Sequence, residues 1–303
     1  TDYIELHRKF ERLGFYNINK LYYIKKIIFI FSLLMGTIYF NSINDVLSGS
    51  MFGLMIQQSA FLGHDIGHNA VLSESTSYFN SKYKSIWAFV FGNVLFGVDG
   101  LNWSHNHNTH HQQCCVPGID TQNDHLPFIL YKKRELDITG YKLNFIQRQL
   151  LKIQWLYILP VLFTIGKINI MLDIDNMKTI KDKQYVRIIG ILLHVAMWVY
   201  FSINSMNKLK FIAAALFFNG MIHLQIILNH AFMPRTTTDE ICDNGWIRSQ
   251  LATTVNIKTS WYDDWFHGGL QYQIEHHLFP RIPRYNFRHV QPYVLNFCKK
   301  HDI

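Results

Sequence analysis

Histidine is gathered in three short polar clusters of this 303-residue sequence, which contains 16 histidines. The clusters are His64-Asp-Ile-Gly-His68, His105-Asn-His107-Asn-Thr-His110-His111 and Gln273-Ile-Glu-His276-His277. Residues three and four positions apart lie on the same face of a helix, so each cluster would direct two or three ring nitrogens to one side. A metal ion needs this arrangement from a single helix, and the spacing therefore predicts metal binding.

The number of candidate ligands indicates more than one metal ion. His230, at the end of an apolar run, joins the clusters, and the candidate ligands are then His64, His68, His107, His110, His111, His230, His276 and His277, with Gln273 in the remaining position. One zinc ion uses four ligands, or three and a water molecule, so this set is about twice too large for one ion. Neutral imidazole suits iron, copper or zinc, and the residues alone leave this choice open.

Carboxylates beside the clusters are predicted to support the ligands. Asp65, Glu275 and Asp264 are expected to accept hydrogen bonds from ring N–H groups and thereby orient the imidazoles. Histidines without the helical spacing, such as His7 and His301, are expected to be solvated or hydrogen-bonded residues with no part in the chemistry.

Long apolar runs indicate a membrane protein. The sequence is 49% hydrophobic and 17% charged, and stretches without Asp, Glu, Lys or Arg occur at 27–40, 51–63, 188–203 and 211–228. Each is shorter than the roughly 20 residues of a spanning helix, so uncharged flanks have to complete the span. Clusters that share one metal site lie on one side of the membrane, and an even number of crossings must therefore separate them. Segments 86–101 and 153–172 are accordingly expected not to cross.

The predicted fold is an all-α integral membrane protein with four transmembrane helices and a cytosolic helical cap that holds the metal site. No repeat or linker divides the chain, so a single domain is expected over residues 1–303. Its expected parts are an N-terminal cytosolic helix at 1–26, a first transmembrane hairpin at 27–64, a cytosolic or interfacial cap at 65–185, a second hairpin at 186–230 and a cytosolic tail at 231–303.

Charge and cysteine usage predict the orientation of this domain. The net charge is +8, but the basic residues are spread along the chain and often flank apolar runs, as Lys25 and Lys26 do, which favours a cytosolic membrane surface over nucleic acid. Four cysteines without a CxxC pair fit a reducing compartment. Both termini and all three clusters are therefore expected on the cytosolic side.

The three clusters resemble the histidine boxes of membrane fatty-acyl and sphingolipid desaturases. HDIGH at 64–68, HNTHH at 107–111 and QIEHHLFP at 273–280 carry the resemblance, which extends through essentially the whole chain, and Gln at the start of the third box is typical of front-end desaturases. The family implies two iron ions held by the eight histidines named above, O2 as co-substrate, and a double bond introduced into a lipid acyl chain with delta-6 or delta-5-like regiochemistry. Whether Gln273 binds iron stays open.

The resemblance also implies an electron donor and a location. Electrons would come from cytochrome b5 and its reductase, and the enzyme would lie in the endoplasmic reticulum membrane. Many front-end desaturases carry a fused cytochrome b5 domain, but no His-Pro-Gly-Gly haem signature occurs in this sequence, which has no cytochrome b5 domain of its own. The segment from Thr1 to Tyr16 resembles the one that follows that domain, so the donor is expected either upstream of it or as a separate protein.

Several alternative functions stay open. The substrate could be a sphingolipid long-chain base desaturated at the delta-8 position, and a membrane hydroxylase could use a similar histidine set. Two other classes are a b-type cytochrome, with haem held by His194 and His223, and a membrane zinc hydrolase. The Gln-type third box and its flanks favour the desaturase over the last three.

A basic cluster follows the third box and predicts a substrate anchor. Its members are Arg281, Arg284, Arg288 and Lys258, which could hold a phosphate or another polar head group. Ordinary positive charge at the membrane surface explains the same residues equally well. If the anchor exists, the new double bond is expected at a constant distance from the polar end of the chain.

Overall fold

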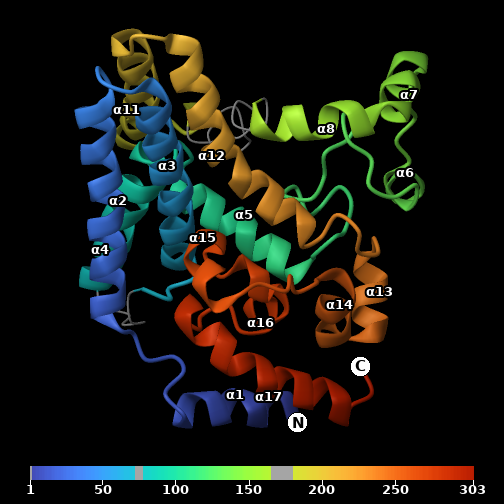
Figure 1. Ribbon diagram of the computed structural model, residues 1–303. Helices are drawn as coiled ribbons and strands as arrows, with labels where there is room; N and C mark the ends of the chain where they lie inside the picture. Colours follow the sequence, from blue (N-terminus) through green and yellow to red (C-terminus); the bar gives the residue numbers. More distant parts are fainter. Residues whose placement is uncertain (1, 72–77, 165–179) are drawn as a thin grey trace. The chain divides into compact units, whose positions relative to one another are not determined.

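The computed structural model describes residues 2–71, 78–164 and 180–303 (Figure 1). These residues form helices and no strands, which agrees with the predicted all-α class. Contacts along the backbone divide the chain into two compact units, the first made of 1–17, 105–159 and 225–303 and the second of 18–104 and 160–224. The chain alternates between the units, and each is described by itself. The single domain stays a prediction.

Long apolar helices dominate the second unit. Among the described residues, three helices are long and apolar enough to cross a membrane, namely α2 (Lys20–Phe40), α11 (Tyr185–Asn204) and α12 (Lys208–Leu228). The helix α3 (Asp45–Gly67) has 23 residues, which is also long enough at about 1.5 Å per residue. Its polar residues Gln57, Gln58 and Asp65 are buried inside the protein. The four helices correspond to the two predicted hairpins, and their four crossings remain a prediction.

Polar contacts fix the start of α3, the helix that carries the first histidine cluster. The Asn44 side chain accepts a hydrogen bond from the backbone N–H of Leu47 at 3.0 Å, as an N-capping residue does. The Asp45 carboxylate accepts from the backbone N–H groups of Met206 and Asn207, each at 2.9 Å. These two bonds connect α3 to the turn between α11 and α12.

Two glycines let α3 pack closely against α12. A Cβ atom on Gly49 would lie 2.3 Å from the carbonyl oxygen of Phe211, and one on Gly53 would lie 2.4 Å from that of Ala215. Such close approach through small residues four positions apart is common between membrane helices. It fixes which face of α3 meets α12 and therefore where the side chains at its C-terminal end point.

The segment 86–101 forms no continuous helix. The helix α4 (Tyr78–Trp87) continues into the π-helix η1 (Ala88–Val94), and a turn separates η1 from α5 (Gly100–Gln112). Of the other segment expected not to cross, 153–172, the structure describes α8 (Gln154–Phe163), which contains Pro160 and has only 10 residues. Residues 165–172 lie outside the described part of the chain.

The imidazole of His194 has a structural role in the second unit. Its Nδ1 donates to the carbonyl of Val94, at the end of η1, over 3.0 Å, and its Nε2 accepts from the indole N–H of Trp198 at 3.1 Å. Both ring nitrogens are thus used, and the residue is fully buried. No ring nitrogen of His194 is left for a haem iron, which argues against the b-type cytochrome.

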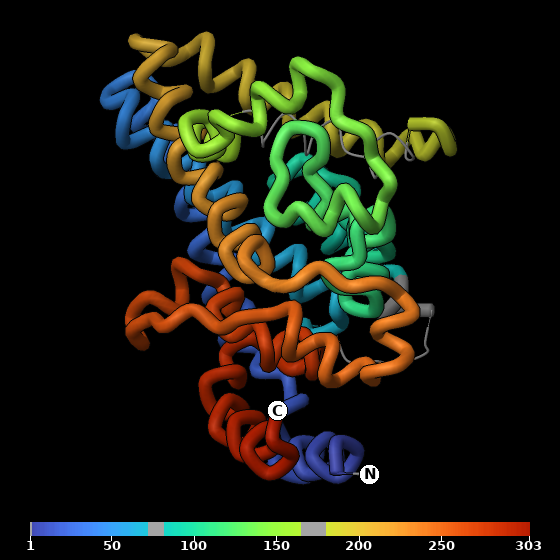
Figure 2. Tube along the Cα trace, turned by 90° about the vertical axis from the view of Figure 1, so that its right-hand side faces the viewer, coloured from blue at the N-terminus to red at the C-terminus, as the bar shows by residue number. Residues whose placement is uncertain are grey.

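The first unit is a set of shorter helices. They are α1 (Asp2–Arg12), most of α5, α6 (Arg134–Thr139), α7 (Phe145–Lys152), α13 (Thr238–Asn244), α14 (Trp246–Thr253), α15 (Asp264–His267), α16 (Gln273–Leu278) and α17 (Phe287–Lys300). Both views show α1 and α17 side by side, with the two termini close together (Figure 1 and Figure 2). The expected N-terminal helix at 1–26 is in fact two helices, since Gly14 takes a positive φ of 74° after α1 and α2 begins at Lys20.

An aromatic core holds α16, which carries the third cluster, against α1 and α17. Its buried members are Phe10, Tyr272, Leu278, Phe279, Ile282, Phe287, Val290 and Val294. The ring of Phe279 packs edge-to-face on Phe10 at 4.9 Å and stacks on Tyr3 at 5.2 Å, and the Tyr3 hydroxyl donates to the carbonyl of Leu278 at 2.7 Å. The N-terminal helix therefore supports the position of the third cluster.

Candidate metal centre

Six of the predicted ligands come together within the first unit. His107, His110 and His111 lie on α5, His276 and His277 on α16, and His230 just after α12. All six side chains are buried, and their rings are close neighbours, with 4.3 Å between the centroids of His111 and His277 and 4.9 Å between those of His110 and His230. His105, which precedes them on α5, is exposed.

Four of these rings have Nδ1 held by an oxygen atom. The pairs are His107 with Oε1 of Gln122 (2.7 Å), His110 with the carboxylate of Asp120 (2.9 Å), His230 with the carbonyl of Thr253 (2.9 Å) and His277 with Oε1 of Gln250 (2.7 Å). These oxygens are acceptors, so Nδ1 carries the ring proton in each case. The lone pair of a neutral ring is then on Nε2.

The Nε2 atoms point toward one another. Nε2 of His110 lies 3.2 Å from that of His277, and the same distance separates Nε2 of His107 and His111. In the pair of His110 and His277 both Nε2 atoms are unprotonated, and two such nitrogens at this distance repel each other unless a cation lies between them. Ligands about 2.1 Å from one metal ion are spaced in this way, so the donor set fits bound metal.

The charge states of His277 and of Asp120, the partner of His110, also fit metal binding. Burial, together with the imidazoles of His111 and His110, lowers the pKa of His277 well below its usual value, so this ring is neutral. Burial by itself would raise the pKa of Asp120, but the contacts with His110 and Asn123 outweigh burial and lower this pKa to about 2. Against the effect of burial, the ionised carboxylate of Asp120 accepts from Nδ1 of His110 and raises the pKa of that ring. A carboxylate in this position is a usual partner of a metal-binding histidine.

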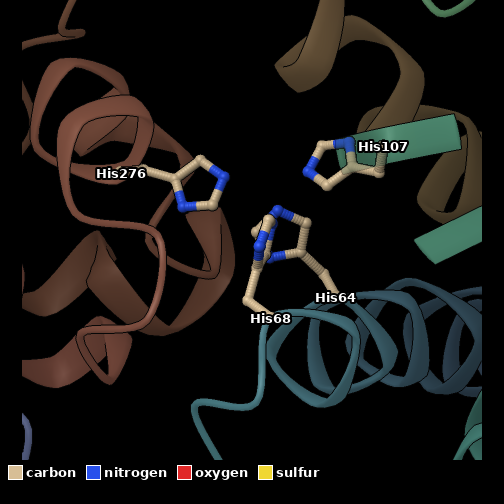
Figure 3. A group of neighbouring side chains, drawn as sticks. All are labelled: His64, His68, His107 and His276. Atoms are coloured by element: carbon tan, nitrogen blue, oxygen red, sulfur yellow. The ribbon is translucent and has the colours of Figure 1, made fainter. Parts of the chain in front are cut away.

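The first histidine cluster belongs to the second unit. His64 and His68 lie one turn apart at the end of α3, with ring centroids 4.7 Å apart. Figure 3 shows both rings projecting from this helix, and it also labels His107 and His276. Asp65, predicted to orient a ligand, accepts from the Tyr23 hydroxyl at 3.1 Å, and its other oxygen lies 3.8 Å from Nδ1 of His64.

Cys114 lies beside the histidines of the first unit without facing the same point. Ligand atoms of His110, Cys114, His230 and His277 lie within 4.8 Å of one another. The Cys114 sulfur, however, is 3.5 Å from Nδ1 of His230, the nitrogen that donates to Thr253. The thiol is therefore behind the His230 ring, away from Nε2, and supports the ring without being a ligand.

The other predicted carboxylates have partners other than imidazoles. Glu275 accepts from the side-chain amide of Asn256 at 2.8 Å, and burial raises the pKa of Glu275 to about 6. Asp264 accepts from Gln271 at 2.8 Å and forms an ion pair with Arg288 at 2.9 Å. The carboxylate that holds a clustered histidine is Asp120, which sequence reasoning missed because it lies in a loop without helical spacing to His110.

The predicted basic anchor is not a uniform exposed cluster. Arg288 is paired with Asp264, and Arg284 is 9% exposed. Arg281 and Lys258 are exposed, and Arg281 also lines a cavity of ≈350 Å³ in the first unit. Tyr3, Trp246 and Phe279 line the same cavity, together with His111 and His277 of the histidine cluster. Any anchoring charge therefore comes from Arg281 and Lys258, which stays a prediction.

A buried ion pair supports the backbone of His230. Nε of Arg235 lies 2.9 Å from Oε1 of Glu135, and the two side chains are 1% and 2% exposed. The Arg235 guanidinium also donates to the carbonyl of His230 at 3.1 Å. The pair thus connects α6 to the segment that carries a predicted ligand.

We expect Glu135→Gln to lower the free energy of unfolding by about 3–5 kcal/mol, because the buried Arg235 charge loses the carboxylate that pairs with it. Denaturant unfolding of purified protein measures this difference. The matched control is Glu240→Gln, since Glu240 pairs with Arg134 through half-exposed side chains. Its expected effect is below about 1 kcal/mol, and equal losses in the two variants would contradict the assignment.

Comparison with known proteins identifies the class and the family. The model of the fatty acid desaturase family matches residues 45–303. The chain is 31% identical over 324 residues to a Delta(8)-fatty-acid desaturase of Borago officinalis, with 100% of this chain and 70% of the relative covered. It is 32% identical over 318 residues to a Delta 8-(E)-sphingolipid desaturase of Komagataella phaffii, with 98% and 57% covered.

A third relative, an Acyl-lipid (9-3)-desaturase of Borago officinalis, is 29% identical, with 100% of this chain and 70% of the relative covered. The family match and these relatives show that the chain is an oxidoreductase of the desaturase class, which its apolar helices and buried histidine clusters fit. The chain belongs to the fatty acid desaturase family. The resemblance carried by the three histidine boxes is thereby confirmed.

Proposed function

We propose that this chain is an O2-dependent di-iron desaturase that introduces a delta-8 double bond into a sphingolipid long-chain base. Relatives that cover the whole chain at about 30% identity are named delta-8 desaturases of fatty acids or of sphingolipids. These names favour the delta-8 alternative over the delta-6 or delta-5-like regiochemistry expected from the third box. The front-end character of the reaction is common to both readings.

The observation that carries the proposal is the set of Nε2 atoms that face one another while Nδ1 donates outward. The proposed iron ligands are the eight histidines predicted from the sequence, His64, His68, His107, His110, His111, His230, His276 and His277. Two bound iron ions would supply the O2 chemistry needed to break unactivated C–H bonds. Asp120, Gln122, Gln250 and the Thr253 carbonyl hold the rings in the tautomer that leaves Nε2 free.

The reaction requires electrons as well as a metal. Removal of two hydrogens from adjacent methylenes, with reduction of O2 to two water molecules, consumes two further electrons and two protons. We propose that cytochrome b5 and its reductase supply these electrons. The proposed location is the endoplasmic reticulum membrane, crossed by α2, α3, α11 and α12, with the histidine boxes and both termini cytosolic. Lys25 and Lys26 in the first turns of α2 support this orientation.

The rival classes fit the chain less well. His194 uses both ring nitrogens within the protein, which leaves a haem without one of its two proposed ligands. A zinc hydrolase needs about half of the available imidazoles. A membrane hydroxylase would use the same ligands, and only the product separates it from a desaturase.

We expect expression of the chain in a desaturase-poor host, together with its electron donor, to yield long-chain bases with a new double bond at carbon 8. Burial of a methylene contributes about 0.8 kcal/mol wherever it lies along the chain. An apolar channel alone therefore discriminates poorly between neighbouring carbon positions, and contacts with the polar end must set the position of the double bond. Feeding chains of several lengths and locating the double bond by lipid mass spectrometry tests this. A bond at constant distance from the methyl end would overturn the front-end assignment, and a hydroxylated product would replace desaturation by hydroxylation.

A further inference from the structure

We infer that Gln273 is not an iron ligand, and that Asn229 holds its side chain so that the amide N–H group, and not the amide oxygen, faces the metal centre. The inference rests on the proposed function. It answers whether Gln273, the first residue of the third histidine box, binds iron. It concerns residues of the first unit alone. Asn229 and Gln273 are 0% and 4% exposed, so their hydrogen bonds are made within the protein.

One end of the relevant hydrogen-bond chain is the carbonyl of Thr253. A carbonyl oxygen only accepts, so Nδ1 of His230 donates to it at 2.9 Å. In the neutral ring, Nε2 of His230 is then an acceptor. The nitrogen Nε2 of Gln273 lies 2.9 Å from it, so this amide N–H group donates to the one lone pair of the ring. A metal ion bound by His230 would take that lone pair and leave the N–H group beside it.

The other end of the chain is the carbonyl of Leu270. The Asn229 side-chain nitrogen donates to it at 2.9 Å, which fixes the amide orientation of Asn229. The same nitrogen lies 3.1 Å from Oε1 of Gln273. Because Asn229 donates to it, the Gln273 oxygen is an acceptor. The carbonyls of Thr253 and Leu270 at the two ends therefore fix the orientation of the side chains between them, those of His230, Gln273 and Asn229.

This orientation disagrees with iron binding by Gln273. An amide binds a hard metal ion through its oxygen, and here the oxygen is directed to Asn229. Turning the amide over would place two N–H donors, one from Gln273 and one from Asn229, against each other in a buried site, where unpaired polar groups are costly. The side chain instead presents an N–H donor beside Nε2 of His230, where it can hold a water molecule or the O2 substrate. Asn229 is then a positioning residue that acts through Gln273.

The test compares purified wild-type enzyme, loaded with 57Fe, with Gln273→Leu and Asn229→Asp. Mössbauer spectroscopy reports the coordination of each iron through its isomer shift, independently of turnover. We expect Gln273→Leu to keep the iron content and both isomer shifts of the wild type while its turnover falls at least tenfold. The fall reflects the lost N–H donor, since removal of one such donor typically costs about 100-fold to 1,000-fold in other active sites.

Asn229→Asp tests the positioning role with Gln273 still present. An ionised aspartate side chain only accepts hydrogen bonds, so the Gln273 amide is expected to turn over and direct its oxygen to the metal. The isomer shift of one iron should then change, which affects about half of the spectral area. The double variant Asn229→Asp/Gln273→Leu should restore the wild-type isomer shifts. Asn244→Asp, an exposed change at the end of α13, is the charge-matched control and should leave the spectrum unchanged.

Two results would overturn the inference. A changed isomer shift for half of the iron in Gln273→Leu, or the loss of one of the two irons, would show that Gln273 is a ligand. A wild-type spectrum in Asn229→Asp would show that Asn229 does not orient the amide. Failure of the proposed function has different signatures, since the wild-type protein would then bind no iron or would form a product other than the delta-8 double bond.

Discussion

We expect that replacing any one of His68, His111 or His277 by alanine will abolish turnover and leave the protein in the membrane. Each residue is proposed to supply one ring nitrogen to a metal ion, and alanine offers no ligand atom in its place. Membrane insertion depends on the apolar helices, which these changes do not touch. Product formation by mass spectrometry and an immunoblot of the membrane fraction measure the two properties separately.

The controls for these variants are His7→Ala and His301→Ala, in which activity is expected to be nearly unchanged. His301 lies at the end of α17, 3.0 Å from Asp2, and His7 packs on Tyr16 with 5.0 Å between ring centroids. Neither of them touches the histidine cluster in these contacts, and His301→Ala is the stricter control because His7 lines the same cavity as His111 and His277. Full activity in a His68, His111 or His277 variant would remove that residue from the ligand set, and a dead His301→Ala enzyme would show that helical spacing selects the wrong histidines.

Asp120→Ala is expected to lower activity or metal affinity by about 10-fold to 100-fold, the usual cost of removing the partner of a metal-binding histidine. The carboxylate holds Nδ1 of His110, and it also accepts from the side chain of Asn123 at 2.8 Å and the backbone N–H of Cys115 at 2.8 Å. The variant therefore loses the group that fixes both the ring tautomer and the loop beside it. Turnover and bound iron per chain are the quantities to measure.

Two related variants separate this role from a general loss of stability. Asp120→Asn keeps an oxygen acceptor and should recover part of the activity. Asp124→Ala changes a carboxylate of the same loop that accepts from the backbone N–H groups of Gly118 and Leu126 and touches no ring in these contacts. It should therefore stay close to the wild type, and equal losses at the two positions would contradict a specific role for Asp120.

The candidate ligands could be selected from the sequence because their signal is local. The spacing within HDIGH, HNTHH and QIEHH is a property of one helical turn, and the structure places two of these clusters and His230 together in one unit. The residues that orient the rings have no such signal. Gln250 lies 27 positions before His277 in the chain, and the Thr253 carbonyl is backbone, which no residue type reveals.

Apolar runs in the sequence marked all four candidate membrane-spanning helices, but such a run reports composition and not the surroundings of a helix. The helices α2, α11 and α12 are apolar enough to stand out, whereas α3 carries polar residues that it buries against its neighbours. The sequence likewise does not reveal the surroundings of the basic residues after the third histidine box. Sequence shows that Arg284, Arg288 and Asp264 exist, but only the fold reveals that Arg284 is buried and that Arg288 is neutralised by Asp264.

The most direct test of the account is the metal content of the purified wild-type protein, measured by elemental analysis of the chain without added chelator. Eight imidazoles exceed the needs of one ion and suit iron, so the expected result is about two iron atoms per chain with little zinc. Removal of this iron should abolish desaturation, and its return should restore it. One zinc atom per chain and little iron would contradict the di-iron desaturase.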